Sequence, residues 1–215
     1  ILLCDKFDMN TERDSFVNLL IQFSGLELGK GKLLDDKNRR FIKEIISIGE
    51  SMGSHLNSAW RPVLSCLFIL MRFFRISEKL RNKKSAEQSS VALSIEEQNA
   101  IMIFDNFECE RIDRIFLDTK LLSEDSLLSF FKGLCDVSIY DIERQSQYFD
   151  LTLEKLIVVV QVNANRNPLE WIRVWEILSY SLEKIICTKG VSGIPSQAYR
   201  IRFAGRLILC SLEVI

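Results

Sequence analysis

The feature that most constrains the fold is a pair of long apolar runs that meet at a short polar corner. The first run covers residues 151–162, and the second begins at Pro168 and continues to Cys187. Trp171 and Trp175 stand four residues apart just after the proline, so a helix that starts there carries both indoles on one side. The pattern therefore predicts two packed helices joined by a tight corner. The tryptophans are predicted to anchor the seam between two helix pairs, and the alternative is that one of them lies at a partner-binding surface.

The rest of the chain shows the same helical spacing of apolar residues. Only 3 prolines and 9 glycines interrupt 215 residues, which suits long helices better than many short strands. The β-branched run 156–160 alone could form a strand, but its flanking residues fit a buried helix and no partner strand is visible. Seven or eight helices of about 12–20 residues are expected, joined mainly by short turns. The sequence therefore predicts an all-α fold of antiparallel helix pairs, stacked as an armadillo- or HEAT-like superhelix.

Several helix boundaries follow from local signals. Thr11 is predicted to cap the first helix. A segment that begins near Ser58 is apolar nearly all round until about Ile76, as expected of a central helix. Ser94 and Glu97 match a capping box for a short helix. The first helix carries an apolar stripe at helical spacing, formed by Phe16, Leu19, Leu20 and Phe23.

The chain is long enough for a single helical domain over residues 1–215, which needs no disulfide or metal to hold it together. Polarity rises sharply after residue 77, and this predicts a flexible polar insert at about 78–106. The first residues lack a basic segment and are too few for a signal peptide, so the start resembles the tail of a helix in a longer protein. No apolar stretch reaches the roughly 18 residues that suggest a membrane span.

Composition and spacing argue against an active site. The net charge of −1 gives no overall attraction to nucleic acid. The six cysteines lie far apart, so they form no short-spaced zinc pair and are predicted to be small buried hydrophobic residues in a reducing cytosol. The single histidine, His55, has no cysteine or acidic cluster near it in sequence and is predicted to be a turn residue. We therefore expect no catalytic, metal-binding or cofactor-binding residue and no small-molecule substrate.

Two basic segments raise the question of contact with anionic lipid. Arg200, Arg202 and Arg206 lie beside apolar residues in the last predicted helix. That helix either contacts a membrane or packs on the helix before it, and packing is the favoured alternative. The basic cluster at 72–84 is predicted to be a solvated helix end and linker, with lipid headgroup contact as the alternative, because acidic residues dilute its charge.

Three ordered segments resemble one protein family. They cover residues 8–25, 45–66 and 112–175, and the third is the most specific. The residues that carry the resemblance include Trp60, Asp113, Arg114, Asn163, Arg166, Trp171 and Trp175. In order and approximate spacing, the segments are similar to large Arf guanine-nucleotide exchange factors of the BIG type. They resemble the helical region after the catalytic Sec-seven domain, which is called the first "homology downstream of Sec-seven" domain. Pro168, Ala164 and the polar insert depart from the family pattern.

The resemblance implies a non-catalytic domain, since the Sec-seven catalytic sequence is not part of the matched region. Family domains of this kind take part in autoinhibition and in recruitment to trans-Golgi membranes, including contact with GTP-loaded Arf. The expected partners are therefore an Arf-type GTPase, other domains of the parent chain and, peripherally, the membrane. The expected location is the cytoplasm, at the Golgi. A generic HEAT-type trafficking adaptor without a GTPase link is the alternative.

Overall fold

The computed structural model describes the chain except for residues 27–31, 85–91, 145, 147, 188–201 and 209–215. The described residues form helices and turns, and they contain no strand. The longer helices are α2 (Asn10–Ser24), α3 (Asp36–Ser51), α4 (Trp60–Lys84), α5 (Ile95–Asn106), α6 (Cys109–Leu117), α7 (Glu124–Glu143), α8 (Phe149–Val162) and α9 (Pro168–Cys187). Shorter elements are α1 (Leu2–Lys6), the 3-10 turns η1 (Gly53–His55), η2 (Asn57–Ala59) and η3 (Asp118–Leu121), and a helical segment at 202–208.

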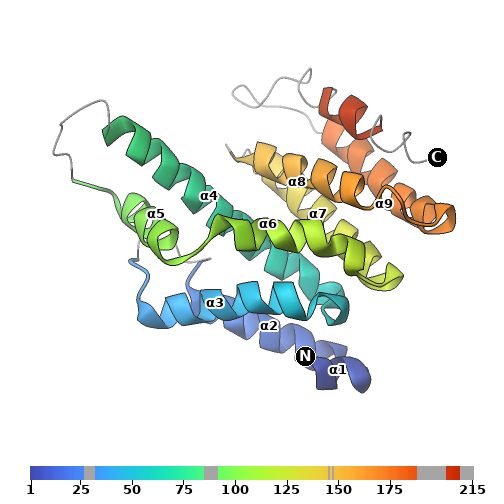
Figure 1. The fold of residues 1–215 in the computed structure, drawn as a ribbon, viewed down its shortest axis with the longest axis horizontal. Helices are drawn as coiled ribbons and strands as arrows, with labels where there is room; N and C mark the ends of the chain where they lie inside the picture. Colours follow the sequence, from blue (N-terminus) through green and yellow to red (C-terminus); the bar gives the residue numbers. More distant parts are fainter. Residues whose placement is uncertain (27–31, 85–91, 145, 147, 188–201, 209–215) are drawn as a thin grey trace.

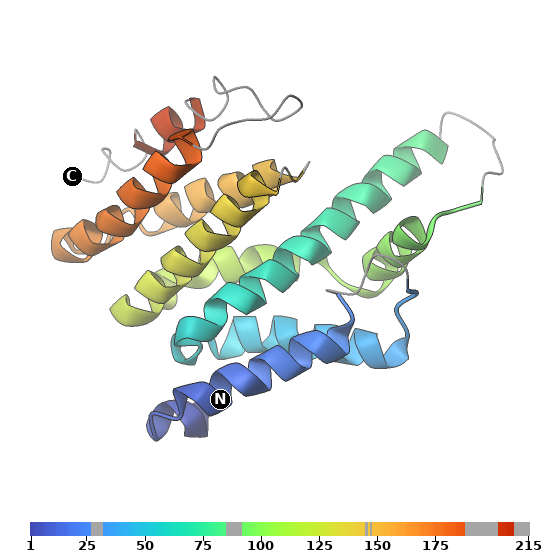
Figure 2. The ribbon, with the colours of Figure 1, turned by 180° about the vertical axis from the view of Figure 1, so that it is seen from behind.

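The helices lie in two layers (Figures 1 and 2). α3, α6 and α8 pack side by side in one layer, which faces the viewer in Figure 1. α2, α4, α7 and α9 pack side by side in the other layer, which is seen from behind in Figure 2. Consecutive helices form antiparallel pairs, as α2 with α3, α4 with α5 and α7 with α8. The prediction of an all-α protein built from packed antiparallel helices is confirmed.

Helix α4 is central, as its apolar sequence predicted. It packs against α2, α3, α5, α6, α7 and α8. Its first residue, Trp60, meets Phe130 of α7 edge to face, with ring centroids 4.6 Å apart. Phe116 of α6 lies 5.9 Å from the Phe130 ring and 5.7 Å from that of Phe68. This aromatic cluster joins the two layers, and aromatic pairs in this geometry contribute stability beyond their burial.

The helix boundaries confirm one local prediction and correct two. The capping box is present, since Ser94 N donates to Glu97 Oε2 at 2.8 Å and Glu97 N to Ser94 Oγ at 3.2 Å. The predicted cap at Thr11 is wrong, because α2 already begins at Asn10. The predicted end of the central helix near Ile76 is also wrong, because α4 continues to Lys84.

The described residues of the predicted polar insert are largely helical. They comprise the last turns of α4 and the whole of α5, while residues 85–91 lie outside the described residues. The last turns of α4 have packing partners that the sequence does not reveal. Arg81 lies 3.9 Å from the ring centroid of Phe104 and pairs with Asp105 at 2.8 Å, so charged side chains hold α4 against α5.

The apolar stripe of α2 faces largely outward, although its spacing suggests an inward face. Phe16, Leu19 and Phe23 are 47%, 50% and 55% exposed, whereas Val17 and Ile21 are buried. Helix α2 has apolar residues on two faces, and the face of Val17 and Ile21 is the one that packs on the core. We call Phe16, Leu19 and Phe23 the α2 stripe.

Gly133 sets the close approach of α7 to α4. A Cβ at Gly133 would lie 3.0 Å from the backbone nitrogen of Arg61 and 3.1 Å from its Cα, and backbone atoms cannot rotate away. We expect Gly133→Ala to lower the free energy of unfolding by about 1–3 kcal/mol, because overpacking outweighs the better helix propensity of alanine.

Urea denaturation followed by circular dichroism measures this change. Gly205→Ala is the matched control, since a Cβ at this position meets nothing within 4 Å. The change brings the same gain in helix propensity as Gly133→Ala. A Gly133→Ala protein as stable as Gly205→Ala would contradict the close approach.

Candidate functional site

The corner between α8 and α9 is built around the buried side chain of Asn163. Its Nδ2 donates to Thr119 Oγ1 at 2.9 Å and to the backbone oxygen of Val159 at 2.8 Å. Its Oδ1 accepts a hydrogen bond from Arg166 Nε at 2.8 Å, and its backbone oxygen accepts one from Trp171 Nε1 at 3.1 Å. One asparagine thus connects α8, η3 and α9, and its buried polar groups are paired.

Arg166 completes this corner by binding the end of η3. Its Nη2 donates to the backbone oxygens of Thr119, Lys120 and Leu122 at 3.3, 3.0 and 2.6 Å. Its Nη1 pairs at 2.9 Å with Glu170, in the first turn of α9. The last carbonyls of a helix have no partner within it, and a guanidinium fork offers several donors at once. Three residues that carry the family resemblance, Asn163, Arg166 and Trp171, therefore form one structural network.

The two tryptophans of the corner have different environments. Trp171 is buried at the α8–α9 corner, as predicted for a seam residue. Trp175 is 37% exposed, so it is not buried with its neighbour. Leu169 and Ile172 are also exposed on α9, at 71% and 58%. Helix α9 therefore presents an apolar outer surface beside a buried anchor.

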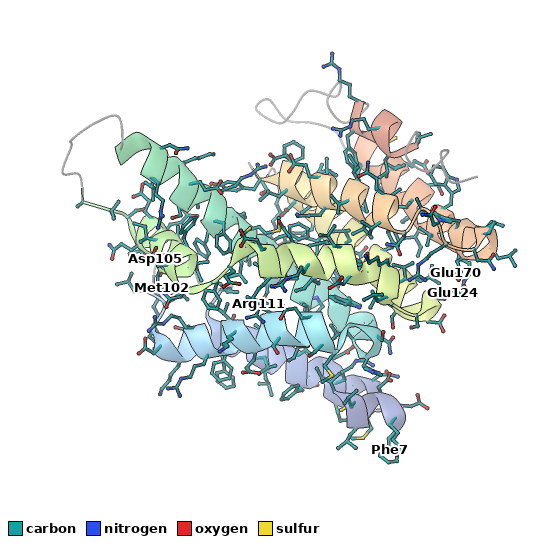
Figure 3. The ribbon with its side chains drawn as sticks, viewed as in Figure 1. Phe7, Met102, Asp105, Arg111, Glu124 and Glu170 are labelled. Carbon is teal, nitrogen blue, oxygen red and sulfur yellow. The ribbon has the colours of Figure 1, made fainter. Side chains whose placement is uncertain are left out.

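Ion pairs connect the helices of the layer formed by α3, α6 and α8. Asp113 of α6 accepts from Lys155 of α8 at 2.7 Å. Arg111, labelled in Figure 3 between α6 and α3, donates to Glu50 of α3 at 3.0 Å. Partly exposed pairs of this kind contribute little energy each, but they fix the spacing of neighbouring helices.

Trp60 and Arg114, which also carry the resemblance, have opposite environments. Trp60 is 1% exposed, and its Nε1 donates to the backbone oxygen of Gly53 at 3.0 Å. It therefore locks the turn before α4 onto the core. Arg114 is exposed on α6, near Leu117, which is 43% exposed. A guanidinium beside an exposed leucine is the kind of surface that protein interfaces use.

Two hollows open beside α3. One has a volume of about 220 Å³ and is lined by residues that include Glu50, His55, Trp60, Asp118 and Leu122. The other, of about 310 Å³, is lined by Asp36, Arg39, Arg40, Lys43, Asn106 and Phe107. His55 Nδ1 lies 2.7 Å from Asp5 Oδ2, so the histidine links the turn to α1, in keeping with its prediction as a turn residue. Within the described part of the chain, no three His, Cys, Asp or Glu residues are placed to hold a metal ion.

The prediction of buried cysteines is confirmed for two of the five cysteines in the described residues, since Cys4 and Cys109 are partly exposed; Cys210 lies outside the described residues. Cys66 and Cys135 are buried, whereas Cys187 is exposed. Burial raises the pKa of the Cys135 thiol to about 12 and that of Cys109 to about 11. Both thiols therefore stay protonated near neutral pH, and a protonated thiol is a poor nucleophile.

The basic segments are mostly engaged within the protein. Arg75 pairs with Asp150 and Glu154, and Arg72 lies over the Tyr148 ring at 4.9 Å. In the segment at 202–208, Arg202 and Arg206 are exposed, while Phe203, Ala204 and Leu207 are buried; Arg200 lies outside the described residues. The apolar side of this segment is covered by protein, which favours the packed alternative. Among the described helices, none combines the length and apolarity that a bilayer span needs.

Comparison with known proteins shows a distant homology. No model of a protein family matches the chain. It is 23% identical over 218 residues to "Brefeldin A-inhibited guanine nucleotide-exchange protein 1" of Arabidopsis thaliana, which covers 80% of the chain and 13% of the relative. It is 22% identical over 211 residues to the protein of that name in Homo sapiens, which covers 84% of the chain and 11% of the relative.

An "ADP-ribosylation factor guanine nucleotide-exchange factor" of Schizosaccharomyces pombe is 25% identical over 206 residues, covering 80% of the chain and 11% of the relative. The chain is therefore a distant homologue of large Arf guanine-nucleotide exchange factors. It spans only 11–13% of the length of these three relatives.

Proposed function

We propose that this chain is a non-catalytic regulatory domain of a large Arf guanine-nucleotide exchange factor. It acts in vesicle trafficking at Golgi membranes, by binding GTP-loaded Arf and other domains of its own polypeptide. The observation that carries the proposal is the homology to three exchange factors, each across at least 80% of the chain. Within such a protein it corresponds to the first "homology downstream of Sec-seven" domain, and its paired helices belong to an armadillo- or HEAT-like superhelix.

The packing of the helices suits this role. Two layers of antiparallel helices, joined through the aromatic cluster around Phe130, form a stiff support. The layer of α3, α6 and α8 is broad, and its helices are connected by the ion pairs of Arg111 with Glu50 and of Lys155 with Asp113. A stack of helices can present an extended binding face in this way without performing chemistry.

The residues that carry the resemblance divide into two groups, and this division suggests where a partner binds. Trp60, Asn163, Arg166 and Trp171 have clear structural roles in the turn before α4 and in the α8–α9 corner. Arg114 and Trp175 are instead exposed, Arg114 on α6 in the α3–α6–α8 layer and Trp175 on α9. Arginine is enriched where proteins contact each other, so Arg114 is the residue on which we centre the Arf-binding face.

Binding to an Arf-type GTPase in its two nucleotide states tests the proposal. We expect the 215-residue chain to bind the GTP-loaded form at least about tenfold more tightly than the GDP-loaded form, which corresponds to about 1.4 kcal/mol. Biolayer interferometry with immobilised GTPase measures both affinities. Equal affinity for the GTP-loaded and GDP-loaded forms, or no binding to either, would contradict the proposal. The generic HEAT-type adaptor would then be the favoured function.

A charge reversal locates the face. Arg114→Glu should weaken binding to the GTP-loaded form about tenfold or more. Lys132→Glu is the matched control, because Lys132 is an exposed cation on α7, in the other layer. If both variants lose binding equally, the effect is one of overall charge and Arg114 is not at the face.

A further inference from the structure

The α2 stripe is the start of a larger apolar surface at one end of the stack. The Phe23 ring stacks on Phe41 of α3, with centroids 5.1 Å apart and an angle of 28° between planes. On the neighbouring α1, Leu2 and Leu3 are 51% and 69% exposed. Phe7, which follows α1, is 64% exposed and lies at the outer edge of the molecule in Figure 3. Several exposed apolar side chains on two neighbouring helices are typical of an interaction site.

The same spacing of apolar residues is covered elsewhere in the stack. In α7, Leu127, Phe130 and Leu134 also follow the pattern i, i+3 and i+7, and each is at most 1% exposed. They are buried because α4 packs against α7, with Trp60 on Phe130. The α2 stripe therefore has the composition and register of an internal stacking face, although no helix of the described chain covers it.

An end face of a finished helical stack has a different character. Terminal helices of stacked repeats carry a polar outer face, which keeps the array soluble. Three aromatic or aliphatic side chains about half exposed on one helix do not fit that role. A membrane is also a poor occupant. Arg13 is buried and pairs with Asp14, so Glu12 is the exposed charge at the start of α2 that has no ion pair within the described chain, and an acidic side chain there would be repelled by anionic headgroups.

We propose that a pair of antiparallel helices from the same, longer polypeptide packs on the α2 stripe and continues the stack. Two observations identify this occupant. The stripe has the register of the α4–α7 interface, and the chain spans only 11–13% of relatives whose remaining length can supply further helices. The inference rests on the proposed function only in placing the chain within such a longer exchange factor.

Thiol accessibility in two contexts tests the proposal. Leu19→Cys places a thiol on the stripe, and Lys132→Cys places one on the exposed side of α7 as a control. Maleimide labelling, resolved by peptide mass spectrometry, is compared in the 215-residue chain and in the complete natural polypeptide. We expect Leu19→Cys to label at least tenfold more slowly in the complete polypeptide, and Lys132→Cys to label equally in both. Equal labelling of Leu19→Cys in both contexts would overturn the proposal.

A second measurement separates a helix pair from a second copy. If the isolated chain dimerises through the stripe, sedimentation velocity will show dimers that the variant Phe16→Ser/Leu19→Ser/Phe23→Ser lacks. That outcome overturns the proposal, whereas a monomer supports it. The triple variant should lower the unfolding temperature more within the complete polypeptide than in the isolated chain, where the three side chains are already about half exposed. None of these readouts depends on Arf, so a failure to bind Arf leaves this inference standing.

Discussion

Replacing Trp60 by alanine should lower the free energy of unfolding by about 3–5 kcal/mol, the range seen when a large buried aromatic side chain is truncated. The indole is 1% exposed, lies edge to face with Phe130, and holds the turn before α4 through its hydrogen bond to Gly53. Its loss leaves a cavity at the junction of α4 and α7 and removes the shorter of two hydrogen bonds to the Gly53 carbonyl, the other coming from Leu56 N at 3.4 Å. Urea denaturation followed by circular dichroism measures the change.

Two further tryptophan variants show which property of Trp60 matters. Trp60→Phe keeps an aromatic ring but removes the N–H donor, and we expect a loss of about 1–3 kcal/mol. Trp175→Ala should cost less than about 1 kcal/mol, since this side chain is 37% exposed. If Trp175→Ala destabilised the protein as much as Trp60→Ala, the buried position of Trp60 could not be the cause.

Replacing Arg166 by alanine should have the second large effect, about 2–4 kcal/mol. The change removes the guanidinium hydrogen bonds to the carbonyls of Thr119, Lys120 and Leu122 and leaves Glu170 without its ion pair. We expect the effect to be local, so amide hydrogen exchange in η3 and at the start of α9 should accelerate more than exchange in α2 or α3.

The conservative variant Arg166→Lys separates geometry from charge. An ammonium group has the same charge, but it lacks the planar fork that reaches several carbonyls and a carboxylate at once. We therefore expect it to recover only part of the lost stability. Arg114→Ala provides the comparison with an exposed arginine and should change stability by no more than about 0.5 kcal/mol. If Arg166→Ala were equally mild, the corner network would not hold η3 in place.

The helices and their class could be predicted because the signals for them are local. The spacing of apolar residues in α4 and the capping box of Ser94 and Glu97 involve residues only a few positions apart. The junction around Pro168 was equally visible, since α9 begins at that residue. The exact helix ends were less predictable, because the cap expected at Thr11 and the helix end expected near Ile76 were both wrong.

Other features depend on residues far apart in the chain and have no local signal. The partners of Arg166 in η3 and at Leu122 lie 44–47 residues away, so the family resemblance marked this residue but its role could not be predicted. Arg13 is 1% exposed and donates to Ser58, 45 residues away, at 2.9 Å. Nothing in its sequence context distinguishes it from a solvated arginine. The outward orientation of the α2 stripe was also hidden, because α2 has two apolar faces and only tertiary packing selects between them.

The pairing of consecutive helices has a mechanical consequence. Helix α2 packs mainly on α3 and α4 mainly on α5, while α7 packs on α9, α4 and α8, so much of the contact surface lies between elements close in sequence. A tensile force applied to the two ends of such an array can detach one pair while the next pair keeps most of its contacts. We therefore expect the protein to unfold under tension in successive steps, one helix pair at a time, rather than in a single event.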